Sequence, residues 1–491
     1  MNQNEVWSFV HTIDQSHLAE GLKNNDKRVR KLTTQRIGVM RDPSEIPHLI
    51  EVLAQERDAY IESQIINALT RMGEPAIPPL IQGLTIGNEN LRCASAKGLG
   101  GIGCVVAIKN LCAAAGDESP LVRRAAVQAL GSIGILNDEV EATVLTCLQD
   151  TDRGVVINAA FASGDLGCSA AVPRLLSLLD EINNYNQRYI IRVLGQIGDT
   201  CATEKLCKLL VKNDGQGNAK VTLETSERGE ELVEALGKIA DPRAVQPIIQ
   251  VLIHSITTDN DNQECDTEDG CTPSCSDEFK RARPSDIAAN IHRALVQIGE
   301  PAIPPLIDTL RAWADKEEDN EDCTGCYPRR GCSVCIVSVA SEISFILSDF
   351  GPLGVDAVLK LLDDENVSVR KLAVNFFTEV HLGEKRVMDA LIACMINDTE
   401  EKVKTLAAYC LVDGGQKSFE AIVSAVDQLH RPFSDIEREA IRLIGSEALS
   451  NLTWCLNQTD EERRCAVDAF RELIKFSPSQ TGMESVSDLS S

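Results

Sequence analysis

The stretch VRRAAVQALGSIG, residues 122–134, decides the fold of this chain. Its small and apolar residues recur at intervals of three and four, at Val122, Ala125, Ala126, Ala129, Leu130 and Ile133. This spacing places them on one face of an α-helix. Several of them are alanines, which let a neighbouring helix approach closely. The stretch therefore predicts a helix that packs against other helices.

The same pattern recurs along the chain. LRCASAKGLGGIG, residues 91–103, keeps the same offsets, and GEPAIPPLI occurs twice unchanged, at residues 73–81 and 299–307. The glycines that close these helices lie 30, 31, 33 and 31 residues apart, at Gly73, Gly103, Gly134, Gly167 and Gly198. We expect left-handed caps at these glycines. A unit of this length holds two short helices and two turns, which indicates an array of helical repeats.

Three later units are longer than the others. The next comparable stops are Ala240, Gly299 and Gly351, which gives steps of 42, 59 and 52 residues. These steps predict insertions near residues 213–226, 257–283 and 316–335. The first insertion is rich in glycine and polar residues and is expected to form a mobile loop, whereas the other two are rich in cysteine.

Helix starts agree with this division. Asp42 and Asp241 each precede a proline, and so does Ser119, which predicts an N-cap followed by proline at the first helical position. In addition, an aspartate precedes an arginine by six residues where two second helices begin, at Asp117 to Arg123 and at Asp364 to Arg370.

Together these elements resemble HEAT repeats, and within them the short repeats first associated with phycobilisome lyases. The resemblance rests on the GEPAIPPLI openings, on the acidic turn before Val-Arg, and on second helices that end in ALGSIG, GLGGIG, VLGQIG, ALGKIA and ALVQIG. It implies an all-α fold, an α-solenoid of about 12 to 13 two-helix units. We expect one continuous solenoid over residues 1–476 and a disordered tail at 477–491.

Charge and hydropathy restrict the partners. The net charge is −26, with 74 acidic and 48 basic side chains, so the average surface repels nucleic acid and anionic membranes. We interpret this excess as a source of solubility, with the steering of a basic protein partner as the alternative. No apolar run approaches the roughly 18 residues of a membrane span, and we expect a cytoplasmic protein. The cluster Lys27, Arg28, Arg30 and Lys31 is interpreted as a solvated helix face.

The eighteen cysteines divide into two groups. Eleven are scattered through the helical units, where a thiol packs much as alanine does; they include Cys93, Cys112, Cys147, Cys394, Cys410 and Cys465. The other seven lie in the two cysteine-rich insertions, in polar and acidic surroundings: Cys265, Cys271, Cys275, Cys323, Cys326, Cys332 and Cys335. Packing in a hydrophobic core does not explain cysteines in such surroundings.

The spacing within these insertions favours a metal. Cys323 and Cys326 form one C-x-x-C pair, and Cys332 and Cys335 form another five residues later, which permits a tetrahedral four-thiolate site. Each insertion joins the first and second helix of its unit, so both loops are expected at one edge of the solenoid, about 10 Å apart.

The first insertion supplies three more thiols, with His254 or His292 as a candidate fourth ligand. Zinc is the first interpretation, and the alternatives are an iron–sulfur cluster and a dithiol/disulfide couple. Zinc that orders two acidic loops and shapes a partner-binding edge is favoured over catalytic zinc.

Motifs for catalysis are missing from the sequence. No histidine is followed by glutamate, as the di-iron hydroxylases among repeat proteins would require, and the chain has no HExxH, nucleophile elbow or phosphate-binding glycine loop. We therefore assign no catalytic residue and predict a non-enzymatic scaffold that holds a protein client on its concave face. The family resemblance implies a tetrapyrrole (bilin) lyase or chromophore chaperone as one alternative, and an iron–sulfur or redox carrier is another.

Overall fold

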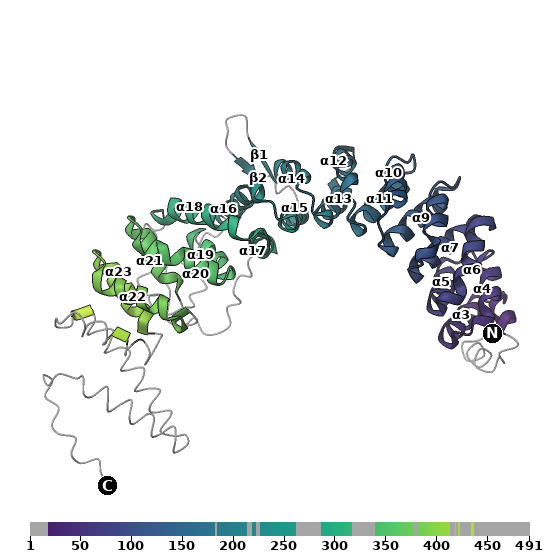
Figure 1. Ribbon diagram of the computed structural model, residues 1–491, viewed down its shortest axis with the longest axis horizontal. Helices are drawn as coiled ribbons and strands as arrows, with labels where there is room; N and C mark the ends of the chain where they lie inside the picture. The colour runs from purple at the N-terminus through teal and green to yellow at the C-terminus, as the bar shows by residue number, and fades with distance from the viewer. Residues whose placement is uncertain are drawn as a thin grey trace, which may run out of the picture. The chain divides into compact units, whose positions relative to one another are not determined.

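The chain is a stack of helix pairs. The computed structural model describes residues 18–181, 184–213, 219–221, 226–261, 286–316, 339–377 and 381–412, with 418, 421, 422 and 434–436. Within these residues, eleven pairs of α-helices follow one another, each with a first and a second helix (Figure 1). The all-α solenoid expected from the sequence is confirmed. In the described part of the chain, no helix has the length and apolar character needed to cross a membrane.

Two compact units divide the chain. The first contains Met1–Val251 and Pro284–Ile298, and the second contains Leu252–Arg283 and Gly299–Ser491. The first helices of the first unit are α2 (Leu18–Leu22), α4 (Ile46–Leu53), α6 (Ile77–Ile86), α8 (Ile108–Ala114), α10 (Asp138–Cys147), α12 (Val172–Glu181) and α14 (Thr203–Leu210). Its second helices are α3 (Lys27–Met40), α5 (Ala59–Met72), α7 (Glu89–Ile102), α9 (Pro120–Ile133), α11 (Arg153–Asp165), α13 (Asn184–Ile197), α15 (Ser226–Ile239) and α17 (Asp286–Ile298).

The remaining helices belong wholly or partly to the second unit. Helix α16 (Val245–Asp261) runs across the boundary between the two units. The second unit then contains α18 (Ile303–Ala314), α19 (Val339–Asp349), α20 (Pro352–Leu359), α21 (Val367–Phe376), α22 (Lys385–Asn397) and α23 (Glu401–Val412).

The helices begin and end where the sequence predicts. The five closing glycines all have positive φ, of 70°, 73°, 72°, 63° and 73° in chain order, which favours glycine over any residue with a Cβ. Ala240 takes the same place with φ 56°, at the steric cost that an alanine has there. Both GEPAIPPLI segments form a one-turn 3-10 helix, Glu74–Ala76 and Glu300–Ala302, followed directly by a first helix.

N-caps are also as predicted. The carboxylates of Asp42 and Asp241 accept hydrogen bonds from the backbone amides of Ser44 and Arg243, and the Ser119 hydroxyl accepts one from the amide of Leu121. A proline follows each of the three caps, where its missing N–H costs nothing.

The first insertion is not simply a loop. Val211–Asn213 (β1) and Ala219–Val221 (β2) form a short antiparallel pair, with Val211 opposite Val221. The sequence prediction missed these strands because three residues are too few to show an alternating pattern. The residues between the strands, 214–218, lie outside the described part of the chain.

Close approach of the second helices is the main feature of the packing in the first unit. A Cβ placed on Gly100 of α7 would lie 2.7 Å from both Cα and Cβ of Ala129 on α9. Gly131, Gly195 and Gly237 meet the alanines Ala162, Ala235 and Ala294 of the following second helix in the same way, at 2.6 to 2.9 Å from Cα. Each contact therefore requires glycine on one helix and alanine on the next. The small residues that repeat in the sequence are the interface.

Arginine side chains join successive repeats at the turn before the second helix. Arg123 of α9 donates from Nη1 to the backbone carbonyl of Asp117 in its own repeat, at 3.0 Å. Its Nε and Nη2 both donate to the carboxylate of Asp150 in the next repeat, at 2.7 Å. We call this arrangement the arginine bridge. A two-point contact between guanidinium and carboxylate fixes both distance and orientation.

The arginine bridge recurs in other repeats of both units. Arg92 pairs with Asp117 at 2.8 Å, and in the second unit Arg370 pairs with Asp398 at 2.8 Å while donating to the carbonyl of Asp364 at 2.9 Å. The six-residue spacing from aspartate to arginine thus corresponds to a hydrogen bond within the repeat. The partner in the next repeat was not predicted, because it lies 25 to 28 residues away.

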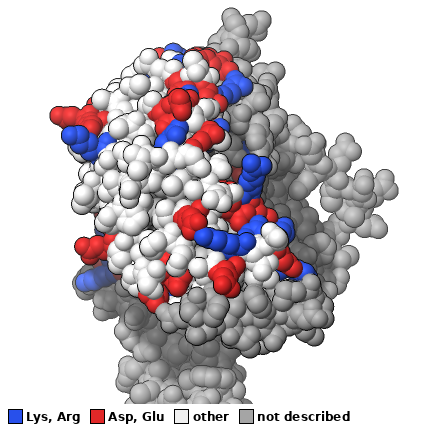
Figure 2. Space-filling view, turned by 90° about the vertical axis from the view of Figure 1, so that its right-hand side faces the viewer, with Lys and Arg blue, Asp and Glu red and all other residues white. Residues whose placement is uncertain are grey.

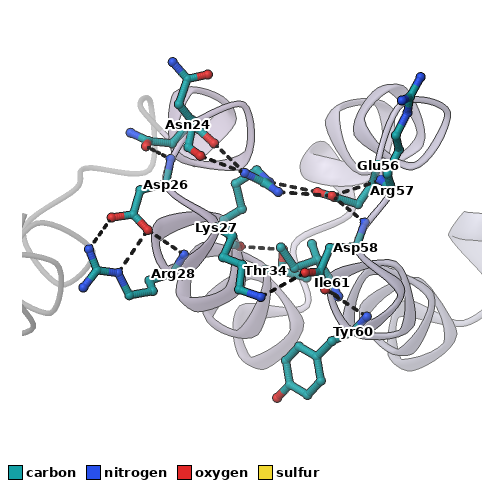
Figure 3. A network of polar contacts seen from close by, with 12 residues as sticks. Asn24, Asp26, Lys27, Arg28, Thr34, Glu56, Arg57, Asp58, Tyr60 and Ile61 are labelled. Atoms are coloured by element: carbon teal, nitrogen blue, oxygen red, sulfur yellow. Dashed lines mark hydrogen bonds and ion pairs between the residues drawn. The ribbon is translucent and has the colours of Figure 1, made fainter.

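The N-terminal bridge corrects the interpretation of one basic cluster. Arg30 donates to the carbonyl of Asn24 at 3.0 Å and to the carboxylate of Glu56 at 2.9 Å, and its side chain is only 19% exposed. Figure 3 shows its two partners, Asn24 and Glu56, from close by. Lys27 pairs with Asp58, and the ammonium of Lys31 lies 4.5 Å from the ring centroid of Tyr60. The prediction of a merely solvated face was wrong for Arg30, because the arginine bridge draws it into the repeat interface.

Replacing Gly100 with alanine tests the packing of the second helices. Alanine favours a helix over glycine by about 1 kcal/mol, but the new methyl group would overlap Ala129, and overpacking costs about 1–3 kcal/mol. We expect Gly100→Ala to lower the urea midpoint of unfolding. In the control Gly116→Ala, the methyl group would meet only a carbonyl oxygen, at 3.5 Å. A Gly100→Ala protein that is as stable as the control would contradict this account.

Replacing Asp150 with asparagine tests the arginine bridge. The hydrogen bonds from Arg123 hold the pKa of Asp150 below its usual value, so this carboxylate stabilises the fold above its unfolded-state pKa. That contribution is lost as the pH falls from about 5 through the lowered folded-state pKa. We expect Asp150→Asn to cost about 1.5–3 kcal/mol at neutral pH and to make the loss of stability on acidification smaller.

Asp356 is the matched control, since its ion pair with Arg386 is 48% exposed on the aspartate side. Asp356→Asn should change the free energy of unfolding by less than about 1 kcal/mol. Chemical denaturation of the three proteins at a series of pH values, from pH 7 to below the usual pKa of an aspartate, measures both effects. Equal losses for the two variants would exclude a special role for the arginine bridge.

Candidate functional site

The seven cysteines predicted to bind metal lie outside the described residues. Cys265, Cys271 and Cys275 fall between α16 and α17, and the other four, Cys323, Cys326, Cys332 and Cys335, fall between α18 and α19. Both insertions therefore join the first and second helix of a repeat, as predicted. His254 and His292 belong to α16 and α17. Among the residues with described positions, no group of three or more His, Cys, Asp or Glu side chains is arranged to hold a metal ion.

The helix cysteines behave largely as core residues. Cys104, Cys147, Cys168 and Cys394 are buried, and Cys93, Cys112, Cys207 and Cys410 are half-buried. Burial raises the pKa of Cys147, Cys207 and Cys394 to about 11, which keeps these thiols protonated. The core prediction fails for Cys201, which is exposed in the turn before α14, and Cys465 lies outside the described residues. The high pKa makes the thiols of Cys147, Cys207 and Cys394 poor nucleophiles.

Basic residues gather on the second helices from α3 to α13, and acidic residues gather on the first helices of the first unit. The six second helices from α3 to α13 carry thirteen Lys and Arg, and their acidic residues are Glu62, Glu89 and Asp165. The first helices from α2 to α14 carry eight acidic and four basic residues. Many of the opposite charges pair, and Figure 2 shows acidic and basic side chains beside one another at the N-terminal end. These six second helices are thus basic in a chain whose net charge is −26, whereas α15 carries four glutamates against one arginine and one lysine.

Large apolar side chains are exposed on these second helices. Leu121 at the start of α9 is 50% exposed, and Phe161 on α11 is 37% exposed. The ring of Phe161 meets that of Tyr189 on α13 edge to face, with centroids 5.8 Å apart. Sequence periodicity does not reveal such residues, because they lie off the buried stripe. One signal in the sequence could have revealed Phe161: it is an aromatic residue at the position where other repeats have Lys97 or Gln128.

Arginines surround the aromatic pair. The Arg188 guanidinium lies 5.0 Å from the Tyr189 ring centroid, and its Nη2 donates to the Tyr189 hydroxyl at 3.1 Å. Arg192, one turn further along α13, pairs with Glu231 of α15. From the other side, the Arg124 guanidinium lies directly over Gly154 of α11, where a Cβ would leave it no room. We call Leu121, Arg124, Phe161, Arg188, Tyr189 and Arg192 the arginine–aromatic surface.

Comparison with known families identifies the repeats. Residues 77–163 match the model for HEAT repeats, and residues 187–212 and 230–254 match the model for the PBS lyase HEAT-like repeat. The matched segments include α9, α11 and the part of α13 from residue 187 onward, which together carry the arginine–aromatic surface.

Individual proteins are similar over part or all of the chain. Phycocyanobilin lyase subunit beta of Thermosynechococcus vestitus is 30% identical over 130 residues, which cover 26% of this chain and 57% of that protein. The match thus spans less than two thirds of the relative. The structure of the complex of CpcE and CpcF of phycocyanin lyase from Nostoc sp. PCC7120 is 24% identical, with 31% of this chain and 99% of that chain covered and a TM-score of 0.28.

Yeast importin-beta is 13% identical, with 96% of this chain and 64% of that chain covered, at a TM-score of 0.46. The matched segments fall on the helical repeats whose ends the closing glycines mark, in the sequence and in the structure alike. The chain contains HEAT repeats, and two of its segments match the PBS-lyase-like type of this repeat.

Proposed function

We propose that this chain is a scaffold that binds a protein partner on the second helices of its first unit. The observation that carries the proposal is the exposure of Leu121 and Phe161 on helices that are fixed by close packing against their neighbours. Aromatic and arginine side chains held on rigid elements are the residues that dominate binding energy at protein interfaces. Exposed singly they would mean little, but here they form one surface across three repeats.

Handling of a tetrapyrrole is the second candidate. It is favoured by the similarity to phycocyanobilin lyase subunit beta over 130 residues. Absorption spectra of the purified chain mixed with phycocyanobilin separate the two candidates. A stoichiometric spectral shift that disappears in Phe161→Ala would favour the chromophore function over the scaffold.

The cysteine-rich insertions are proposed to bind zinc. Two C-x-x-C pairs, five residues apart, supply four thiolates, and three further cysteines lie in the preceding repeat. Zinc there would order a partner-binding edge, whereas an iron–sulfur cluster would serve electron transfer or cluster delivery.

Site-specific photo-crosslinking tests the scaffold function. A benzophenone amino acid replaces Phe161 on the second-helix face, and in a matched protein it replaces Thr143 on first helix α10 of the same repeat. We expect a defined partner to crosslink in cells at position 161 and not at position 143. The partner is then purified and its affinity measured with and without Phe161→Ala, which should weaken binding about tenfold or more. Equal crosslinking at the two positions, or unchanged affinity, would refute binding on this face.

Elemental analysis of protein purified without oxygen tests the zinc site. We expect stoichiometric zinc, lost when Cys323 and Cys332 are both replaced by serine, with a lower melting temperature because bound metal stabilises the fold. Cys201→Ser is the matched control, since Cys201 is exposed and lies outside the insertions. Iron with broad absorption near about 400 nm would favour the cluster instead. A metal-free protein whose melting is unchanged by chelators would rule out both.

A further inference from the structure

The arginine–aromatic surface occupies equivalent positions on successive second helices. Arg124 and Arg188 each lie ten residues before a closing glycine, Gly134 and Gly198. Phe161 and Arg192 each lie six residues before one, Gly167 and Gly198. In repeats of one geometry, equal offsets place side chains in parallel rows. The surface therefore consists of two rows, one with Arg124, Ile157 and Arg188, and one with Gln128, Phe161 and Arg192.

Contacts already made within the protein hold these side chains in place. Phe161 is braced by Tyr189, Arg188 stacks on the same tyrosine, and Arg124 lies against Gly154. A side chain that is fixed before binding loses less conformational entropy when a partner arrives. The guanidinium groups nevertheless stay accessible, because the side chain of Arg124 is 41% exposed and that of Arg192 is 46% exposed.

Acidic groups near the surface are few and placed at its margins. Asp152 approaches Arg124 at 3.5 Å from the start of α11, and Glu231 of α15 pairs with Arg192. Asp165 lies one turn beyond Phe161 on the same helix. No acidic residue lies on α9 or α13 themselves. Arg124 and Arg192 therefore each have an acidic partner, and Arg188 is the cation that lies against the aromatic pair, in a chain that is acidic as a whole.

We infer that this surface binds an acidic segment of the partner protein, one that also carries an aromatic or large aliphatic side chain. This inference rests on the scaffold function and specifies the chemistry of its ligand. The carboxylates would take two-point hydrogen bonds from the guanidinium groups, and the apolar side chain would cover Phe161 and Leu121. Repulsion from the rest of the acidic chain is screened beyond about 8 Å at physiological salt, so a short segment feels chiefly the local arginines.

Fluorescence anisotropy with defined 12-residue peptides tests the ligand chemistry. The first probe contains six Asp or Glu and one Phe, the second replaces that Phe with Ala, and the third replaces every Asp and Glu with Lys. We expect the first probe to bind the full chain, the second to bind about tenfold more weakly, and the third not to bind. Raising the salt concentration should weaken the binding of the first probe.

Variants locate the binding. Arg124→Gln, Arg188→Gln and Phe161→Ala should each weaken binding of the first probe about tenfold, while Arg174→Gln on first helix α12 should change it less than twofold. Arg174 is a suitable control because it lies in the same part of the stack and pairs with Glu181 on its own helix. Circular dichroism melting confirms that each variant is folded.

Three results would overturn the inference: tighter binding of the lysine probe, no dependence on the surface variants, or tighter binding of a single-stranded oligonucleotide of the same charge. A further outcome is a partner that crosslinks through position 161 and keeps its affinity when its own acidic residues are replaced. That result would leave the scaffold function intact and remove this inference alone. Absence of any partner at position 161 would remove the scaffold function itself.

Discussion

The fold depends on how closely its second helices approach one another. Where Gly100 faces Ala129 and Gly131 faces Ala162, the two backbones are so close that a methyl group on the glycine would overlap the next helix. Such contact gains dispersion energy where the two helices meet and leaves little room for them to slide past each other. It also turns the outward faces of these helices into a regular surface, because each helix is held at a fixed position relative to the next. The exposed side chains at equivalent positions of α9, α11 and α13 are therefore regularly spaced.

Polar contacts set the second constraint, at the turns. Burial raises the pKa of Asp117 and Asp398, but the paired arginines outweigh burial and keep both pKa values below normal. The carboxylates therefore stay charged in the folded protein. Packing of small residues alone tolerates rotation about the helix axis, whereas a two-point ion pair does not. The combination gives a stack that is both close and oriented.

Local signals in the sequence predicted the helices and their ends, because each depends on a few neighbouring residues. Gly103 and Gly134 adopt the left-handed conformation that a helix cap favours, and Asp241 with Pro242 begins a turn as such a pair does elsewhere. The contact from Arg123 to Asp150 and the pairing of Val211 with Val221 were not predicted, since their partners are brought together only by the turn of the chain. The arginine–aromatic surface was missed for a related reason: hydrophobic periodicity finds buried faces, and Phe161 lies outside one. The cysteine-rich insertions have no helical period, so their interpretation rests on ligand spacing alone.

The bridges of Arg123 and Arg370 each have a backward bond, from the guanidinium to a carbonyl of the same repeat, and a forward bond, to an aspartate of the following repeat. In the bridge of Arg30 the forward partner is Glu56. Asp117 links two bridges, because its carboxylate binds Arg92 and its backbone carbonyl accepts from Arg123. Any repeat that carries this aspartate and this arginine can thus follow any other. Gene duplication can add or remove such repeats without new interface residues, because the same hydrogen bonds join each of these repeats to its neighbours.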